Sequence, residues 1–339
     1  MRSSPFISAL RSHGGGTPDG QREILRGYGI TEEFCGCPIR ASMETIVVCQ
    51  TREGFPVHFD NHASQADHVL VVGRVKPHTE LFGDHQSGLM KMLLIGLGKH
   101  EGAKIYHRAF VDHSFDHIVR SVGRRVIEKG RILAGLGIVE NAYDQTGLIR
   151  AVLPHEFEAQ DRELLALAVK WLPRLPFDHA DLLLVDEIGK EISGCGMDTN
   201  VIGRRGIRDF EDLARPRIRV IGALELSPSS QGNALGVGNA DFITQRLRDA
   251  IDEHKTLINT LTTGDMDRAK IPATLPTDEV LIKTVAERYG TNRWAVIPNT
   301  LHLEEILVSQ DLCAELASAP GCRVDPTPIR LNYEHGRLL

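Results

Sequence analysis

Four histidines and four lysines lie within residues 73–108, GRVKPHTELFGDHQSGLMKMLLIGLGKHEGAKIYHR. Imidazole is suited to moving protons near neutral pH and is a common metal ligand. A lysine amine becomes a nucleophile where burial lowers its pKa. The members of this group are His78, His85, His100, His107, Lys76, Lys91, Lys99 and Lys104. Both residue types in one short stretch indicate a catalytic or cofactor-binding site.

The spacing of these residues excludes the common zinc signatures. The chain has no His-Glu-x-x-His and no Cys-x-x-Cys, and Cys35-Gly-Cys37 lacks the two-residue gap of the usual zinc half-site. Lys91 lies in an apolar setting, SGLMKMLLIG, which has two interpretations. The side chain either extends to the surface or is buried with a lowered pKa and serves as a nucleophile.

A further candidate is His13, in the stretch SHGGGTPDGQ at 12–21. The preceding PFISAL is typical of a strand, and Thr17 can cap a helix whose first residue is Pro18. Loops at the carboxyl ends of strands bind ligands in open α/β sheets, and glycines let a ligand approach the backbone. The alternative is a plain strand-to-helix turn with an exposed histidine.

The scaffold for these residues follows from short apolar runs that alternate with helical periodicity, which indicates an α/β fold with mostly parallel sheets. Most runs are continuously apolar, as in strands buried on both faces. Strands are predicted at 5–10, 44–49, 68–73, 131–139, 181–189 and 217–224. Helices are predicted at 18–27, 115–128, 157–170, 240–253, 278–288 and 301–308. The strand at 68–73 would deliver Lys76 and His78 to its carboxyl end.

The length of 339 residues predicts two domains, and the proline-rich LPRLPF at 172–177 indicates a boundary near 175. We expect two Rossmann-like domains, a cofactor-binding domain at 1–175 and a second α/β domain at 176–339, with the active site in the cleft between them. In the second domain, the charged stretch 186–205 either helps to close that cleft or is a solvated loop. The glycine-rich stretch 225–242 either binds a phosphate or carboxylate or is a simple loop.

Composition and charge exclude several function classes. The net charge is −6 with no long basic run, so nucleic-acid and membrane-surface binding are not indicated. No window of 18 apolar residues occurs, and the amino terminus lacks a secretory signal pattern. Six scattered cysteines are typical of reduced thiols, so we expect a cytoplasmic protein.

From about residue 12 to 110 the chain resembles the amino-terminal domain of the nickel-dependent lactate racemase family. That pattern runs Pro-His, a glycine-containing loop, Ser-Gly-Gly-x-Lys, a glycine five residues after the lysine and a histidine sixteen residues after it. Here Pro77-His78 precedes Ser87-Gly88-Leu89-Met90-Lys91, and Gly96 and His107 follow Lys91 by five and sixteen residues. Ser12-His13-Gly14 ahead of a helix is similar to the family's upstream Gly-x-His.

The resemblance implies a racemase or epimerase of a 2-hydroxy acid that transfers hydride to a nickel pincer nucleotide, a pyridinium thioamide/thiocarboxylate mononucleotide. It implies that Lys91 tethers this cofactor, with Gly88 and Gly96 beside it, and that His107 binds the nickel. His13 and His78 would be the two acid/base residues. Neutral imidazoles suit proton transfer in both directions, and soft sulfur and nitrogen ligands suit nickel. The implied partners are a small-molecule 2-hydroxy acid and the cofactor-building enzymes of the same cell.

The sequence departs from the family pattern at two places. The family carries Asp-x-Thr-Arg well before the first histidine, whereas the nearest string here, CQTR at 49–52, has cysteine for aspartate and lies downstream of His13. We therefore hypothesise that the first βα units are missing, a truncation that could remove activity while the motifs remain. The loop from His78 to Lys91 is three residues longer than a lactate enzyme's, which leaves lactate, another 2-hydroxy acid or a sugar acid as the substrate.

Two other functions fit the same residues. One is a different metalloenzyme, such as a hydrolase in which His78 and His107 act with an activated water. The other is a non-catalytic protein whose glycine-rich loops bind an anionic ligand or a nucleotide.

Overall fold

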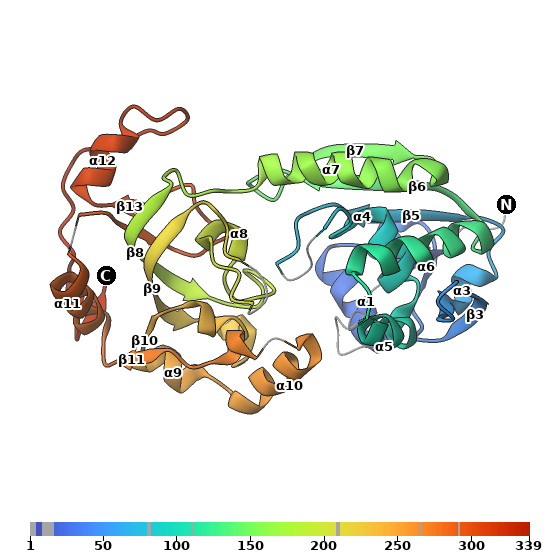
Figure 1. Cartoon of the computed structure of the whole chain (residues 1–339), viewed down its shortest axis with the longest axis horizontal. Coiled ribbons are helices and arrows are strands. Elements are labelled where there is room, and N and C mark those ends of the chain that lie inside the picture. Colours follow the sequence, from blue (N-terminus) through green and yellow to red (C-terminus); the bar gives the residue numbers. More distant parts are fainter. Residues whose placement is uncertain are drawn as a thin grey trace. The chain divides into compact units, whose positions relative to one another are not determined.

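The computed structural model describes residues 5–8, 17–79, 83–109, 112–207, 211–264, 266–290 and 292–339, with the backbone alone at 107, 262 and 263. The chain divides into two compact units, Met1–Leu172 (unit 1) and Pro173–Leu339 (unit 2), as Figure 1 shows. Helices and parallel strand pairs occur in both units, which confirms the predicted α/β class. Among the described residues, no helix combines the length and the apolar character needed to cross a bilayer.

The described strands of unit 1 form two strand pairs and one three-stranded sheet. β1 and β2 are parallel, β3 and β4 are antiparallel, and the larger sheet has the order β5-β6-β7 with β5–β6 parallel and β6–β7 antiparallel. The strands are β1 (Phe6–Ile7), β2 (Ile39–Arg40), β3 (Thr45–Gln50), β4 (Pro56–Asp60), β5 (Val69–Arg74), β6 (Ile132–Glu140) and β7 (Thr146–Val152). The helices are α1 (Pro18–Gly27), α2 (Glu32–Cys35), α3 (Asn61–Ser64), α4 (Gly88–Lys91), the π-helical η2 (Met92–Gly96), α5 (Lys99–Ala109), α6 (Phe115–Lys129), η3 (Pro154–Glu156) and α7 (Phe157–Trp171).

Capping side chains explain where two of these helices begin. Thr17 Oγ1 accepts a hydrogen bond from Gly20 N at 3.1 Å, and Pro18 is the first residue of α1, as predicted. Ser114 caps α6 in the same way, since its hydroxyl accepts from His117 N at 3.3 Å. Each cap satisfies one N–H group that the helix itself leaves without a partner.

The core of unit 1 lies between one face of the β5-β6-β7 sheet and the helices α4, α6 and α7 (Figure 1). Gly135 and Gly137 of β6 point to these helices and let them approach closely. A Cβ on Gly135 would lie 2.6 Å from a Leu89 methyl carbon, and one on Gly137 would lie 2.6 Å from a Leu164 methyl carbon. The glycines of β6 therefore set how deeply the helices pack.

The opposite face of this sheet corrects a prediction. Leu70 and Val72 of β5 are 52% and 44% exposed, and Ile149 of β7 is 58% exposed. The register places them on one face, because Leu70 pairs with Ala134 of β6 and Ile149 pairs with Ile138. Continuous apolar character predicted burial on both faces, which is wrong here because the described helices of unit 1 that contact the sheet pack on its other face.

Unit 2 contains a six-stranded sheet in the order β11-β10-β9-β8-β12-β13, parallel except for β13. Its strands are β8 (His179–Ile188), β9 (Arg217–Leu226), β10 (Phe242–Thr244), β11 (Ala273–Leu275), β12 (Trp294–Ile297) and β13 (Leu307–Val308), with a separate hairpin of β14 (Tyr333–Glu334) and β15 (Arg337–Leu338). Its helices are α8 (Thr199–Ile202), η4 (Pro228–Ser230), η5 (Val237–Asn239), α9 (Gln245–Ala250), α10 (Glu253–Thr263), η6 (Asp267–Ala269), α11 (Asp278–Tyr289) and α12 (Gln310–Leu316). β8 and β9 are buried on both faces, as predicted: Leu182 and Leu184 belong to the core cluster that includes α11, and Leu183 and Val185 belong to the other cluster.

Four of the six predicted helices are confirmed, one is confirmed only in its second half, and one is wrong. The predictions at 18–27, 115–128, 157–170 and 278–288 match α1, α6, α7 and α11 within one residue. The range 240–253 instead contains β10, which pairs in parallel with β9 and β11, before α9 begins at Gln245. The range 301–308 contains a loop whose first N–H groups donate to Asn299 Oδ1, followed by β13.

Candidate functional site

The carboxyl end of β5 is joined to the start of α4 by the side chains of Gln86 and Ser87. Ser87 Oγ donates to Lys76 O at 2.6 Å and accepts from Lys76 N at 2.7 Å. Gln86 Oε1 accepts from His78 N at 2.9 Å, and Gln86 O accepts from Lys91 Nζ at 3.1 Å. Gln86 therefore connects the predicted acid/base residue His78 with the predicted cofactor tether Lys91.

Lys91 is half-buried at the end of α4, and its amine lies 6.0 Å from the centroid of the Phe115 ring, at the limit of a cation–π contact. The residues that follow, Met92–Gly96, form one π-helical turn in which Leu97 N donates to Met92 O at 3.0 Å. Single π-helical turns are frequent at functional sites. Gly96, predicted to bind the cofactor, is buried at the end of this turn.

Lys99, eight residues after Lys91, has different surroundings. Its amine and the Asp60 carboxylate are both fully buried, with Nζ 3.2 Å from Oδ2, and the amine also donates to Ser8 O. Burial lowers the pKa of Lys99, and the facing Asp60 carboxylate partly offsets this. Because the Lys99 amine is fully buried and paired with Asp60, Lys99 has a structural role, whereas the half-buried Lys91 is the more accessible of the two lysines.

Asp161 of α7 accepts hydrogen bonds from the first N–H groups of α4. Its Oδ1 accepts from Leu89 N at 3.0 Å, and its Oδ2 accepts from Met90 N at 2.7 Å. Gly88 has a φ of 87°, and a Cβ there would lie 2.5 Å from Asp161 Oδ1. Burial raises the pKa of Asp161 to about 6, although the hydrogen bonds from Met90 and Leu89 and the nearby His85 oppose this rise. A glycine is therefore needed at position 88 to leave room for the Asp161 carboxylate. That Gly88 contacts the cofactor stays a prediction.

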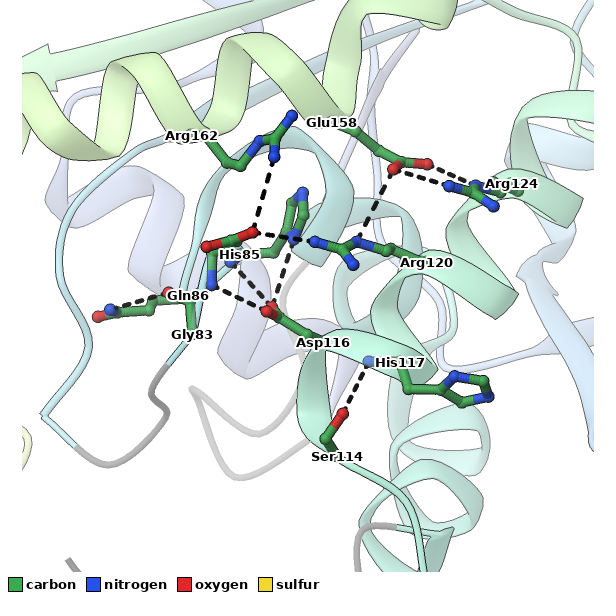
Figure 2. A network of polar contacts seen from close by, with 11 residues as sticks. Gly83, His85, Gln86, Ser114, Asp116, His117, Arg120, Arg124, Glu158 and Arg162 are labelled. Carbon is green, nitrogen blue, oxygen red and sulfur yellow. Dashed lines mark hydrogen bonds and ion pairs between the residues drawn. The ribbon is translucent and has the colours of Figure 1, made fainter.

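A second carboxylate, Asp116 of α6, holds the loop before α4 (Figure 2). Its Oδ2 accepts from Asp84 N at 3.0 Å, and its Oδ1 accepts from His85 N at 3.1 Å and lies 3.3 Å from His85 Nδ1. Gly83 has a φ of 125°, and a Cβ there would lie 2.8 Å from Asp116 Oδ2. Arg120 donates to the Asp84 carboxylate at 3.0 Å. The buried His85 thus fastens the loop to α6.

The three predicted histidines differ in how far the structure describes them. His78 is half-buried and is linked to Lys91 through Gln86. His13 lies outside the described residues. His107 is in α5, but its side chain is outside the described part of the chain. Among the described residues, no three His, Cys, Asp or Glu side chains are grouped so that they could hold a metal ion.

A surface pocket of about 620 Å³ lies along α6 and the β3–β4 turn. Its charged side chains pair with one another: Arg125 contacts Glu128 at 2.9 Å, and His117 contacts Glu53 at 2.7 Å. Burial favours a raised pKa for Glu53, but hydrogen bonds from Ser121, the backbone and other side chains lower it to about 2. Two other lining arginines, Arg120 and Arg124, pair with Asp84 and Glu158 beside the pocket.

In unit 2, both loops that the sequence singled out begin at the carboxyl edge of the sheet. Glu191, just after β8, accepts from the hydroxyl groups of Ser227 and Ser230, which follow β9. The chain order reverses between β8 and β12, so a topological switch point lies at this edge, the usual place for ligands in open α/β sheets. Ligand binding by either loop stays a prediction.

Sequence reasoning missed three residues of the site, Gln86, Asp116 and Asp161. Asp161 had a detectable signal, because it lies four residues after Phe157 and three before Leu164, on the buried stripe of α7. Gln86 and Asp116 had no such signal, because their hydrogen-bond partners come close only when the loop before α4 packs against β5 and α6.

Comparisons with known proteins were made for both sequence and structure. No protein-family model matches the sequence, and no curated protein matches it. The structure is similar to the lactate racemase apoprotein from Thermoanaerobacterium thermosaccharolyticum, with a TM-score of 0.50, 11% identity, and coverage of 88% of this chain and 84% of that chain. A protein from Thermotoga maritima aligns with a TM-score of 0.41 and 10% identity over 78% of this chain and 76% of that chain. The chain therefore has a lactate racemase-like fold.

Proposed function

We propose that this chain belongs to the nickel-dependent lactate racemase family and is an isomerase that racemises or epimerises a 2-hydroxy acid. The observation that carries the proposal is the position of Lys91. Its half-buried amine precedes a π-helical turn and is connected through Gln86 to His78 at the carboxyl end of β5. The lactate racemase-like fold supports the proposal, because the family resemblance falls on these same residues.

The chemistry of this site suits a nickel pincer nucleotide. Lys91 Nζ donates to Gln86 O at 3.1 Å beside the Phe115 ring, which places the side chain at the end of α4, where the family resemblance puts the covalent tether. Gly88 and Gly96, which we assign to the cofactor by the resemblance, are the first residue of α4 and the last residue of the π-helical turn that follows Lys91. The sulfur arms of a pincer ligand bind nickel themselves, so a single imidazole, which we assign to His107, completes the donor set.

When bound, such a cofactor takes up and returns the hydride of the substrate's α-carbon. The chain's own contribution is proton transfer and positioning. His78 and His13 would each take the hydroxyl proton from one face of the substrate and return it. Gln86 fixes the backbone of His78 through the His78 N–H group, so the imidazole starts from a defined point relative to Lys91.

The substrate class is a small 2-hydroxy acid, either lactate, a longer hydroxy acid or a sugar acid. The enzyme would act in the cytoplasm and depend on cofactor-building enzymes of the same cell. A chain made in a host without those enzymes would carry an unmodified Lys91 and have no racemase activity.

The test is the intact mass of the chain purified from its native host, with fragmentation of the peptide that contains Lys91. We expect a covalent adduct on Lys91 that disappears in Lys91→Ala and persists in Lys104→Ala, which removes an exposed lysine that pairs with Glu101. Chiral chromatography of 2-hydroxy acids then measures racemisation. An unmodified Lys91 from cells that make the cofactor would contradict the proposal.

A further inference from the structure

The loop that leads to Lys91 contains the same arrangement twice. Gly83 and Gly88 both have positive φ angles, and each is followed by two residues whose N–H groups donate to one carboxylate. Asp116 receives the first pair of N–H groups from α6, and Asp161 receives the second pair from α7. Each carboxylate thus accepts hydrogen bonds from two consecutive N–H groups: Asp116 from residues 84 and 85, and Asp161 from residues 89 and 90. We call these two arrangements the Asp116 clamp and the Asp161 clamp.

We propose that Asp116 and Asp161 are positioning residues that fix the direction in which Lys91 presents its amine. The proposal rests on the function proposed above in one respect, namely that the Lys91 amine is the reactive group. It adds which residues fix the backbone that carries that amine.

The start of α4 needs such outside support. Ser87 stands at the N-cap position, where a serine hydroxyl normally accepts from the N–H groups of the first turn. Its hydroxyl instead bonds the backbone of Lys76, so the N–H groups of Leu89 and Met90 would be buried without partners. Asp161 supplies both acceptors from seventy residues further along the chain. α4 has only four residues and continues into a π-helical turn, so it has little stability of its own.

Each clamp also depends on its glycine. A side chain at Gly88 would displace the Asp161 carboxylate, and one at Gly83 would displace Asp116, because their Cβ atoms would lie 2.5 Å and 2.8 Å from the carboxylate oxygens. Removal of a carboxylate and substitution of its glycine should therefore have the same effect on Lys91.

The experiment measures how fast a small amine-reactive acylating reagent modifies Lys91 in the full chain, with Lys104 as the internal reference, by peptide mass mapping. Asp161→Asn and Asp116→Asn should each raise the Lys91:Lys104 labelling ratio by about threefold or more, because loss of a buried hydrogen bond shifts a local opening equilibrium several-fold. Gly88→Ala should do the same. Glu163→Gln, which removes an exposed carboxylate from the same helix as Asp161, should leave the ratio unchanged.

An unchanged ratio in folded Asp161→Asn and Asp116→Asn would overturn the proposal. If neither variant folds, amide hydrogen exchange of the unmodified chain decides: protected N–H groups at 84, 85, 89 and 90 support the clamps, and rapid exchange there refutes them. Labelling requires no cofactor, so the two proposals can fail separately. If the labelling ratio changes but Lys91 from native cells carries no adduct, the positioning role stands and the racemase proposal is rejected. If Lys91 carries the adduct but the ratio is unchanged, the racemase proposal stands and the positioning role is rejected.

Discussion

Replacement of Asp161 by asparagine tests whether the ionised Asp161 carboxylate lowers the free energy of unfolding. Burial raises its pKa from 3.8 to about 6. At about 1.4 kcal/mol for each pKa unit, ionised Asp161 destabilises the folded state by about 3 kcal/mol at neutral pH. A pKa that rises on folding gives stability that is fully present below the unfolded pKa and is lost as the pH rises through the folded value. The unmodified chain should therefore lose stability relative to Asp161→Asn as the pH rises through these two values.

The two tryptophans make the measurement specific to unit 1. Trp171 ends α7, the helix of Asp161, whereas Trp294 belongs to β12 of unit 2. With Trp294→Phe in both proteins, the fluorescence of Trp171 follows unfolding of unit 1 in urea. The difference in unfolding free energy between the two proteins should change by about 3 kcal/mol between about pH 3 and pH 7. The amide also loses one acceptor, but that loss is independent of pH and only shifts the whole curve.

If the unfolding free energies of the two proteins changed with pH in parallel, this reasoning would be refuted. Asp161 would then ionise as easily in the folded chain as in the unfolded one. Glu163→Gln is the matched control, because Glu163 is 61% exposed on the same helix, and its curve should run parallel to that of the unmodified chain. His85 is a titratable group that lowers the pKa of Asp161, and it remains present in all of these proteins.

Three further tests, with their control and rescue variants, measure the packing of unit 1 by urea unfolding. Lys99→Met should cost about 3–5 kcal/mol, because Asp60 stays buried without its counter-charge, and adding Asp60→Asn should recover part of the loss. Gly135→Ala should cost about 1–3 kcal/mol, because its Cβ would lie 2.6 Å from a leucine methyl carbon, whereas Gly27→Ala meets no atom within 4 Å and should not destabilise. Ile149→Thr, at a side chain 58% exposed, should change stability by no more than about 0.5 kcal/mol, and a larger loss would mean that this sheet face is covered.

The sequence predicted the elements whose signals are local. Thr17 and Pro18 marked the start of α1, and the apolar run at 68–73 marked β5 within one residue. The periodicity of 157–170 predicted α7 because its apolar residues recur every three to four positions. In each case a cap or a repeat within the element decides the structure, so neighbours far along the chain are not needed.

The elements that the sequence mispredicted depend on distant contacts. The range 240–253 has helical spacing, yet Phe242–Thr244 pairs with β9 and β11 and becomes a strand. The π-helical turn Met92–Gly96 reads as an ordinary apolar run, because the extra residue in the turn leaves no mark on composition. The exposure of one face of β5 could not be predicted either, because an apolar run does not show whether helices will cover one face of the strand or both.

Contacts with distant residues also distinguish the two lysines of the segment after α4 begins. Lys91 and Lys99 stand at the two ends of one apolar segment, MLLIGLG at 92–98. Asp60 of β4 pairs directly with the amine of Lys99, and both groups are fully buried. Asp161 of α7 instead accepts hydrogen bonds from the backbone just before Lys91, whose amine donates to Gln86 O. One carboxylate thus encloses a lysine amine, and another fixes the backbone that carries a lysine. Only the half-buried Lys91 keeps its side chain within reach of a small molecule.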